Sequence, residues 1–264
     1  MRNFTFKGLF LTAVFALLWS LTIQAAEDGL ITKQITIKLK EAGTLPDRID
    51  ASKKYLITNL KLVGEINGTD WKMIREMAGS NYNGYSTEGK LSTLDLSEAK
   101  IVKGGDYYYQ NKDYNDNNNY YYTSNDVIGS YAFYDCSGLT SLTLPAGITS
   151  IGEFAFSYCS GLTSIYVYAE KVPRIGRYAF EGCASRKCTL YVPKGTYDNY
   201  RLSEFGYFEN IVEFDATGID KTTTSTDVEE VSRYSADGQR LAVPVKGLNI
   251  VKYSDGTARK VVVK

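Results

Sequence analysis

Hydrophobic residues recur along the chain in an LxxLxL stretch, in which apolar side chains alternate with polar ones. The clearest copies begin at Leu139 and Leu162, 23 residues apart. Earlier copies begin at Ile57 and Leu91, and a shortened last copy covers Leu190 to Val192. In each copy the alternating residues point to one face of a short strand. A pattern that returns every 20–29 residues or so (about one supersecondary unit) predicts stacked repeats that each contribute one strand.

A second apolar set lies between the strands. It reads IGSYAF, IGEFAF and IGRYAF, beginning at Ile128, Ile151 and Ile175. Apolar residues at its first, fifth and sixth positions suit a short helical turn on the side opposite the strand. One unit cannot bury both faces, whereas stacked units bury them against their neighbours, and each buried Phe stabilises the stack by about 1.5–3 kcal/mol. We therefore expect a repeat solenoid of short parallel strands with helical turns on the opposite side.

The flanks of the repeats carry signals of their own. Residues 35–39 alternate apolar and polar, which predicts a half-buried strand that caps the stack. Residues 69–78 predict a helix that Thr69 caps and Gly79 ends, with Trp71 on its buried apolar stripe. The apolar run at 205–214 predicts the closing element.

The repeated pattern IGxxAFxxCxxLxxIxLPxxVxxIG resembles the BspA-like leucine-rich repeat family of bacterial surface proteins. The resemblance is strong from Ile128 to about Val192, and residues 56–102 resemble the region that often precedes such repeats. It implies a right-handed strand–helix solenoid, export from the cell, and binding to proteins or host surfaces. It supplies no catalytic residues.

Residues 104–126 interrupt the repeat with seven Tyr and six Asn and almost no aliphatic residue. Because Asn, Asp and Gly favour turns, we expect a loop on one face of the stack. Its Tyr clusters either pack on the scaffold or form a recognition surface beside the strand face, as Tyr-rich binding loops do. The candidate residues are Tyr107, Tyr108, Tyr109, Tyr120, Tyr121 and Tyr122. A calcium loop at Asp113 fails, because Asn118 and Ser124 replace the required Gly and Glu, and no metal site is expected.

The central residue of each LxL triplet faces away from the core, and these residues form a second candidate surface. Along the stack they are Lys61, Asp95, Thr143, Tyr166 and Tyr191. Their polar neighbours are Asn59, Thr93, Ser141, Ser164 and Thr189. Repeat stacks often bind ligands on this face. An ordinary solvated sheet face is the alternative, since a fold alone does not establish a function.

The two ends of the chain predict processing and a separate small unit. Residues 1–26 read as a signal peptide, with an uncleaved anchor helix as the alternative. We expect the solenoid at 27–215, a Thr-rich linker at 216–227 and a small β segment at 228–264, where Asp-Gly pairs separate strand-like runs. This tail resembles the short C-terminal all-β segments of exported proteins that carry a sorting signal.

Composition narrows the possible chemistry. The chain has 264 residues, a formal net charge of zero and no histidine. The charge balance gives no sign of a nucleic-acid partner. The lack of His excludes Ser-His-Asp and Cys-His catalysis as well as His-based zinc sites. No apolar stretch after the signal peptide has the length needed to span a membrane.

The four cysteines follow the repeat more closely than they follow a disulfide pattern. Cys136, Cys159 and Cys183 are 23 and 24 residues apart and occupy one position in three successive units. We expect them to be small, buried, free side chains. Cys188 is out of register and close to Cys183, which leaves a local bridge between these two open.

Together these features predict an exported binding protein, on the outer surface of a Gram-negative bacterium or released from it. Adhesion to host or matrix proteins is the leading interpretation, and a glycan-binding surface module is the alternative. A glycan-acting enzyme is less favoured, because no acid pair stands out on a shared face and short strands offer no deep pocket. We expect no cofactor. The sequence identifies neither the ligand nor the oligomeric state.

Overall fold

The computed structural model describes residues 29–112, 115, 117–183, 187–216, 230–235, 239–241, 243, 245–253 and 258–263. The chain divides into two units, with the boundary between Ala216 and Thr217. The predicted signal peptide and the Asp-Gly pairs of the tail lie outside the described residues. No helix in the described part of the chain is long and apolar enough to cross a membrane.

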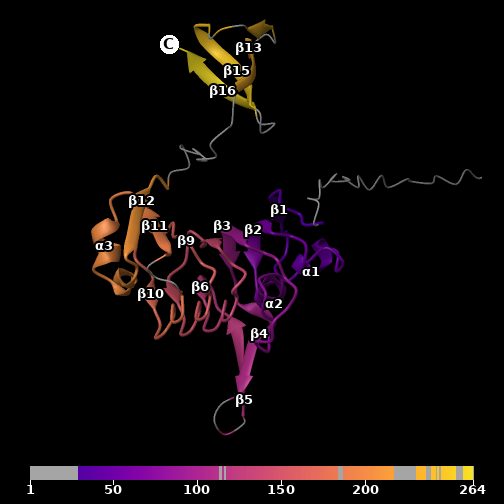
Figure 1. The fold of residues 1–264 in the computed structure, drawn as a ribbon, viewed down its shortest axis with the longest axis vertical. Coiled ribbons are helices and arrows are strands. Elements are labelled where there is room, and N and C mark those ends of the chain that lie inside the picture. Colours follow the sequence, from indigo (N-terminus) through magenta and orange to yellow (C-terminus); the bar gives the residue numbers. More distant parts are fainter. Residues whose placement is uncertain are drawn as a thin grey trace, which may run out of the picture. The chain divides into compact units, whose positions relative to one another are not determined.

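A seven-stranded parallel sheet forms one side of the first unit, with its strands in chain order (Figure 1). The strands are β1 (Ile35–Lys38), β2 (Asn59–Ile66), β3 (Thr93–Ile101), β7 (Ser141–Thr143), β9 (Ser164–Tyr166), β11 (Thr189–Pro193) and β12 (Asn210–Phe214). The first apolar residues of successive LxL triplets pair directly: Leu60, Leu94, Leu142, Ile165 and Leu190. All five are buried. The predicted strands and the capping strand at the start of the sheet are confirmed.

The opposite side of the unit is built from turns instead of the expected helical turns. The Ile of each Ile-Gly pair ends a two-residue strand, and the three strands β6 (Val127–Ile128), β8 (Ser150–Ile151) and β10 (Arg174–Ile175) pair in parallel. The following residues form successive tight turns, in which Tyr131 and Phe154 take left-handed φ angles of 59° and 53°. A helix would use its N–H groups internally. Here every second N–H points to the next unit instead.

These inter-unit hydrogen bonds repeat from unit to unit. The N–H groups of Tyr131, Phe133 and Asp135 donate to the carbonyl groups of Glu153, Ala155 and Ser157, at 3.0, 2.7 and 2.9 Å. The next unit repeats this, since Phe154, Phe156 and Tyr158 donate to Arg177, Ala179 and Glu181 at 3.1, 2.7 and 2.7 Å. The helical prediction is therefore wrong at this point, because every second backbone N–H group of the turns donates to the next unit and not within its own segment.

The repeated Phe and Gly residues explain how closely the units approach. Phe133, Phe156 and Phe180 stack with centroid separations of 5.3 and 5.1 Å and interplanar angles of 10° and 6°. The expected burial of these Phe residues is confirmed. A Cβ atom at Gly152 or Gly176 would overlap the backbone of the preceding unit. These two Ile-Gly pairs therefore need glycine, because the units are too close together for a side chain at this position.

The N-terminal end of the stack is covered by two helices, α1 (Leu45–Arg48) and α2 (Gly68–Met77). The cap of α2 is Asn67 and not the expected Thr69: the Asn67 side chain accepts from the Thr69 N–H at 3.0 Å. The Asp70 carboxylate accepts in return from the Asn67 N–H at 2.9 Å, which completes a capping box. Gly79, at φ +101°, follows the last turn as predicted, and Trp71 is buried as predicted.

The insertion forms a β-hairpin in place of the expected loop. Its strands are β4 (Gly104–Lys112) and β5 (Asn118–Thr123), which pair antiparallel. Figure 1 shows the hairpin extending away from the seven-stranded sheet, on the side of α2. The Asp106 N–H donates to the Thr69 hydroxyl at 3.0 Å, which ties the hairpin to the first turn of α2. The hypothesis that the insertion lies beside the strand face is therefore wrong.

The C-terminal end of the first unit is closed by α3 (Tyr197–Arg201), the 3-10 helix η1 (Glu204–Tyr207) and β12. Phe205 and Phe208 from this region are buried against Phe180. The second unit is an antiparallel sheet in the order β14-β13-β15-β16. Its strands are β13 (Glu230–Ser235), β14 (Arg240–Leu241), β15 (Gly247–Tyr253) and β16 (Ala258–Val263).

All four cysteines are free and buried, so the bridge between Cys183 and Cys188 that the sequence left open is absent. The thiols at the repeat position follow the stack: Cys159 donates to the Phe133 carbonyl at 2.8 Å, and Cys183 to the Phe156 carbonyl at 2.9 Å. Burial raises the pKa of Cys136 to about 11 and raises the pKa of Cys159 as well.

These thiols are expected to resist modification in the folded protein. At pH 8 a maleimide should react slowly with Cys136 and Cys159, because both are inaccessible and largely protonated. In denaturant they should react within the mixing time, as read by intact mass. The Ser160→Cys variant supplies the control, since Ser160 is exposed one residue from Cys159. Native labelling of Cys159 as fast as that of the control would contradict the buried position.

Candidate functional site

The five strand-face candidates form one row across the sheet. Lys61 pairs with Asp95, Asp95 with Thr143, Thr143 with Tyr166, and Tyr166 with Tyr191. All five are partly exposed. The structure therefore brings together residues that are up to 130 positions apart (191 − 61) in the chain, because each unit adds one strand in the same register. The row has a charged end and an aromatic end.

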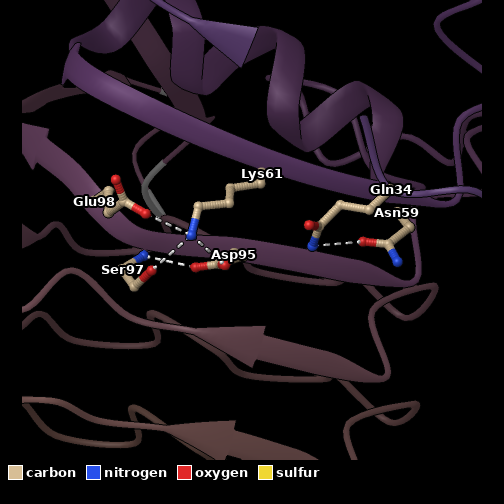
Figure 2. A network of polar contacts seen from close by, with 6 residues as sticks. All are labelled: Gln34, Asn59, Lys61, Asp95, Ser97 and Glu98. Atoms are coloured by element: carbon tan, nitrogen blue, oxygen red, sulfur yellow. Dashed lines mark hydrogen bonds and ion pairs between the residues drawn. The ribbon is translucent and has the colours of Figure 1, made fainter. Parts of the chain in front are cut away.

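The charged end is centred on Lys61. Its ammonium lies 3.1 Å from Asp95 Oδ2, 2.8 Å from Glu98 Oε1 and 3.4 Å from Ser97 Oγ (Figure 2). Burial lowers the pKa of Lys61, but the hydrogen bonds and charges of Glu98 and Asp95 outweigh it and leave that pKa raised. Two carboxylates therefore share one ammonium here.

Glu98 and Ser97 reach Lys61 because β3 contains a bulge. Lys61 on β2 pairs with Asp95 on β3, and Val63 pairs with Glu98. From the first pair to the second, β2 advances by two residues and β3 by three, so β3 contains one extra residue. The extra residue turns the strand locally, and the Ser97 N–H donates to Asp95 Oδ1 at 2.9 Å. Simple alternation along the strand would not have placed Glu98 near Lys61, so the sequence interpretation missed it. The Asp-x-Ser spacing was the available signal, since Asp side chains often accept from the N–H two residues on.

The aromatic end is a cluster of rings on β9, on the residues just after β9, and on β11 and β12. Tyr166 and Tyr191 stack face to face, with centroids 4.3 Å apart and an interplanar angle of 6°. Phe214 meets Tyr166 edge-on at 5.8 Å and Tyr168 at 5.0 Å. Burial raises the pKa of Tyr166 and of Tyr168. Tyr168 and Phe214 were missed, although the alternation Tyr166-Val167-Tyr168 places Tyr168 on the same face.

The Tyr-rich hairpin has two faces, of which one packs on the scaffold. Tyr108 and Tyr109 are buried, and the Tyr108 hydroxyl donates to the Ser130 carbonyl at 2.8 Å. Tyr109 stacks on Tyr131 at 5.0 Å, and Tyr121 lies 4.9 Å from the same ring. Burial raises the pKa of Tyr108, and it raises that of Tyr109 to about 12. Tyr108 and Tyr109 are therefore closed to a ligand in this structure.

The outer face of the hairpin carries the other candidates. Tyr107 meets Tyr120 edge-on at 4.9 Å and Tyr122 at 6.3 Å. Tyr120 is 47% exposed and Tyr122 is 56% exposed. The Lys72 ammonium lies 4.8 Å from the Tyr107 ring, and Tyr82 completes the group. Lys72 and Tyr82 could not be identified from the sequence, because α2 and the loop after it meet the hairpin only in the folded chain.

Comparison with known proteins agrees with the repeat architecture. A family model described as a BspA type leucine rich repeat region (6 copies) matches residues 105–229. The match begins inside the hairpin and includes β7, β9, β11 and β12. Repeats of this type imply a protein-binding scaffold. A search of curated proteins finds no match to this chain.

Proposed function

We propose that this protein is an exported adhesin, a leucine-rich repeat solenoid that binds another protein through the outer face of its seven-stranded sheet. The partner we favour is a host or matrix protein met at the bacterial surface, where proteins with repeats of this type are commonly found. The observation that supports this most is the Tyr166–Tyr191 stack, placed with Phe214 beside a charged end on the same open face.

The composition of this face is that of a recognition surface. Solvated sheet faces are normally covered by small polar and charged residues, whereas Tyr is enriched among the residues that dominate binding energy. The two rings are already stacked, so little side-chain entropy remains to be lost when a partner covers them. The charged end next to them would fix the partner's orientation, since charges give specificity more than affinity.

Binding fits this face better than catalysis does. Asp95 and Glu98 are the acid pair nearest the row, and both are held by the same Lys61 ammonium. An acid pair that acts on a glycosidic bond needs one protonated and one free carboxyl group on either side of the bond. Two carboxylates that both contact one ammonium are not placed on opposite sides of a bound sugar. We therefore propose a binding role without enzymatic activity. We also propose that the second unit serves in export or attachment, on its resemblance to sorting-type tails.

The Tyr166→Ala, Tyr191→Ala double variant tests the proposed function. We expect it to lose at least about tenfold in affinity, because two aromatic anchors commonly carry more than 1.4 kcal/mol between them. The measurement is biolayer interferometry against purified extracellular-matrix proteins, with a glycan panel alongside. Tyr85→Ala, Tyr197→Ala is the matched control, since both rings are exposed elsewhere. Selective retention of glycans by the wild type, with no matrix protein bound, would replace protein adhesion by the glycan-binding alternative.

A further inference from the structure

The row of backbone hydrogen bonds on the turn side stops at the last repeat unit. In the two preceding units, three alternate N–H groups donate to the carbonyl groups of the unit that follows. The equivalent groups in the last unit belong to Tyr178, Phe180 and Gly182. Within the described residues, no backbone or side-chain acceptor is found for these three N–H groups. The last unit therefore presents an open edge of the same spacing that each unit offers to its neighbour.

At the other end of the turn stack, side chains of α2 bond to the backbone groups of the first unit, so among the described residues backbone groups without partners occur at one end of the stack. At the first unit, Arg75 from α2 donates to the Tyr131 and Ala132 carbonyl groups at 2.7 and 3.0 Å. Trp71 donates through its indole nitrogen to the Ala132 carbonyl at 3.0 Å. Terminal units of repeat proteins normally need such a cap. At the far end, η1 packs beside the last unit without supplying acceptors for the open N–H row.

A groove of about 340 Å³ lies along this open edge, between the last turn and η1. Its floor includes the buried Ala179 and Phe180. Its walls include Tyr178, 56% exposed, and Tyr207, 52% exposed. Gly176 and Gly182 contribute no side chains to fill it. The floor is fixed by the packing of Phe180 against Phe208, whose rings meet edge-on at 4.9 Å.

The charged residues that line the groove are acidic. Glu181 and Glu204 are both exposed there, and no Lys or Arg is among its lining residues. Within the described residues neither carboxylate takes part in an ion pair. The Tyr178 ring already accepts a guanidinium at long range, with Arg177 5.9 Å from its centroid. Carboxylates beside exposed aromatic rings suit a cation, through charge attraction and cation–π contact together.

We propose that this groove binds an extended segment of a partner protein that carries an Arg or Lys side chain. The segment's carbonyl groups would accept from the N–H groups of Tyr178, Phe180 and Gly182, in the manner of a strand added to a sheet edge. Its basic side chain would lie between Glu181 and Glu204, against the rings of Tyr178 and Tyr207. The site is separate from the strand-face row, so its test stands independently of the proposed adhesion site.

The experiment uses blocked hexapeptide pools in which the central residue is fixed as Arg, Lys, Gln or Glu. Binding of the full chain to each pool is measured by fluorescence polarisation. We expect the Arg and Lys pools to bind about tenfold more tightly than the Gln pool, and the Glu pool more weakly still. Equal binding of the Arg and Gln pools would overturn the charge assignment.

Two further measurements locate the site. The Glu181→Gln, Glu204→Gln variant should lose the preference for basic pools, whereas Glu88→Gln, Glu153→Gln, with the same change in charge at two other exposed positions, should keep it. Hydrogen exchange should show new protection within residues 178–182 when the Arg pool is bound. Unaltered exchange there, or an equal loss in both variants, would show that the peptide binds elsewhere and would overturn the proposal.

Discussion

Replacement of Arg75 by methionine is expected to lower the free energy of unfolding of the first unit by more than about 3 kcal/mol, since removing the donor of a buried hydrogen-bond network is among the costliest single changes. Arg75 is fully buried on α2. Its guanidinium lies 4.7 Å from the centroid of the Tyr109 ring. It donates to the carbonyl oxygens of Asn81, Tyr131, Ala132 and Tyr134 and to the Ser80 hydroxyl, at 2.7–3.2 Å.

The size of the effect follows from what the side chain joins. One guanidinium connects α2, the loop that follows it, the first turn of the repeat stack and the Tyr-rich hairpin. Methionine fills a similar volume but leaves those carbonyl groups without a donor, and each unsatisfied buried group costs about 1–3 kcal/mol. Arg75→Lys should recover only part of the loss, because a single ammonium cannot reach all the acceptors that surround the planar guanidinium group.

Urea unfolding followed by circular dichroism measures the change. The control is Arg177→Met, which removes an exposed guanidinium that also lies near a tyrosine ring; surface changes of this kind usually stay within about 0.5 kcal/mol. An Arg75→Met variant as stable as the control would mean that water or a local rearrangement satisfies the freed carbonyl groups, and that the cap at this end of the stack is dispensable.

The strand side of the fold could be predicted because its rule is local. An LxL triplet indicates which residues of a strand face inward, and the repeat period predicts that successive triplets pair in register. The row from Lys61 to Tyr191 therefore follows from the sequence. The same rule gave the burial of the Phe and Cys positions. Where the sequence departs from that rule, as in the β3 bulge that brings Glu98 to Lys61, the side-chain partners were missed.

The turn side was misread because two arrangements share one spacing. Apolar residues at first, fifth and sixth positions fit a helical turn, but they also fit alternating tight turns whose N–H groups bind the next unit. The second arrangement requires left-handed φ angles at aromatic residues such as Tyr131 and Tyr178, which single-residue preferences disfavour. Inter-unit hydrogen bonds and ring stacking, visible only in the stacked structure, outweigh that local cost.

The hairpin was missed for a related reason. Gly, Asn and Asp in residues 104–126 favour turns, yet the tyrosines of this segment pack against Trp71, Arg75 and Tyr131, all of which lie outside it. The strands also contain a register shift between Gly104 and Tyr109. Consecutive residues Tyr108 and Tyr109 are consequently both buried, which strict alternation does not allow.

The two faces of the hairpin are expected to respond to mutation in opposite ways. Tyr108→Ala should destabilise the first unit by about 3–5 kcal/mol, the usual cost of removing a buried aromatic ring. Tyr108→Phe keeps the ring against Trp71 and removes only the hydrogen bond to the Ser130 carbonyl, so it should cost about 1 kcal/mol. Thermal and urea unfolding of the two variants separate ring packing from hydrogen bonding.

The outer face supplies the matched comparison. Tyr107→Ser, Tyr120→Ser, Tyr122→Ser removes three rings instead of one, yet it should cost less than Tyr108→Ala, because Tyr120 and Tyr122 are about half exposed. We also expect this triple variant to retain binding through the strand face, since the hairpin extends away from that sheet (Figure 1). A loss of matrix-protein binding with unchanged stability would assign the outer tyrosines a recognition role of their own, which the rings of Tyr108 and Tyr109 cannot share because the scaffold already covers them.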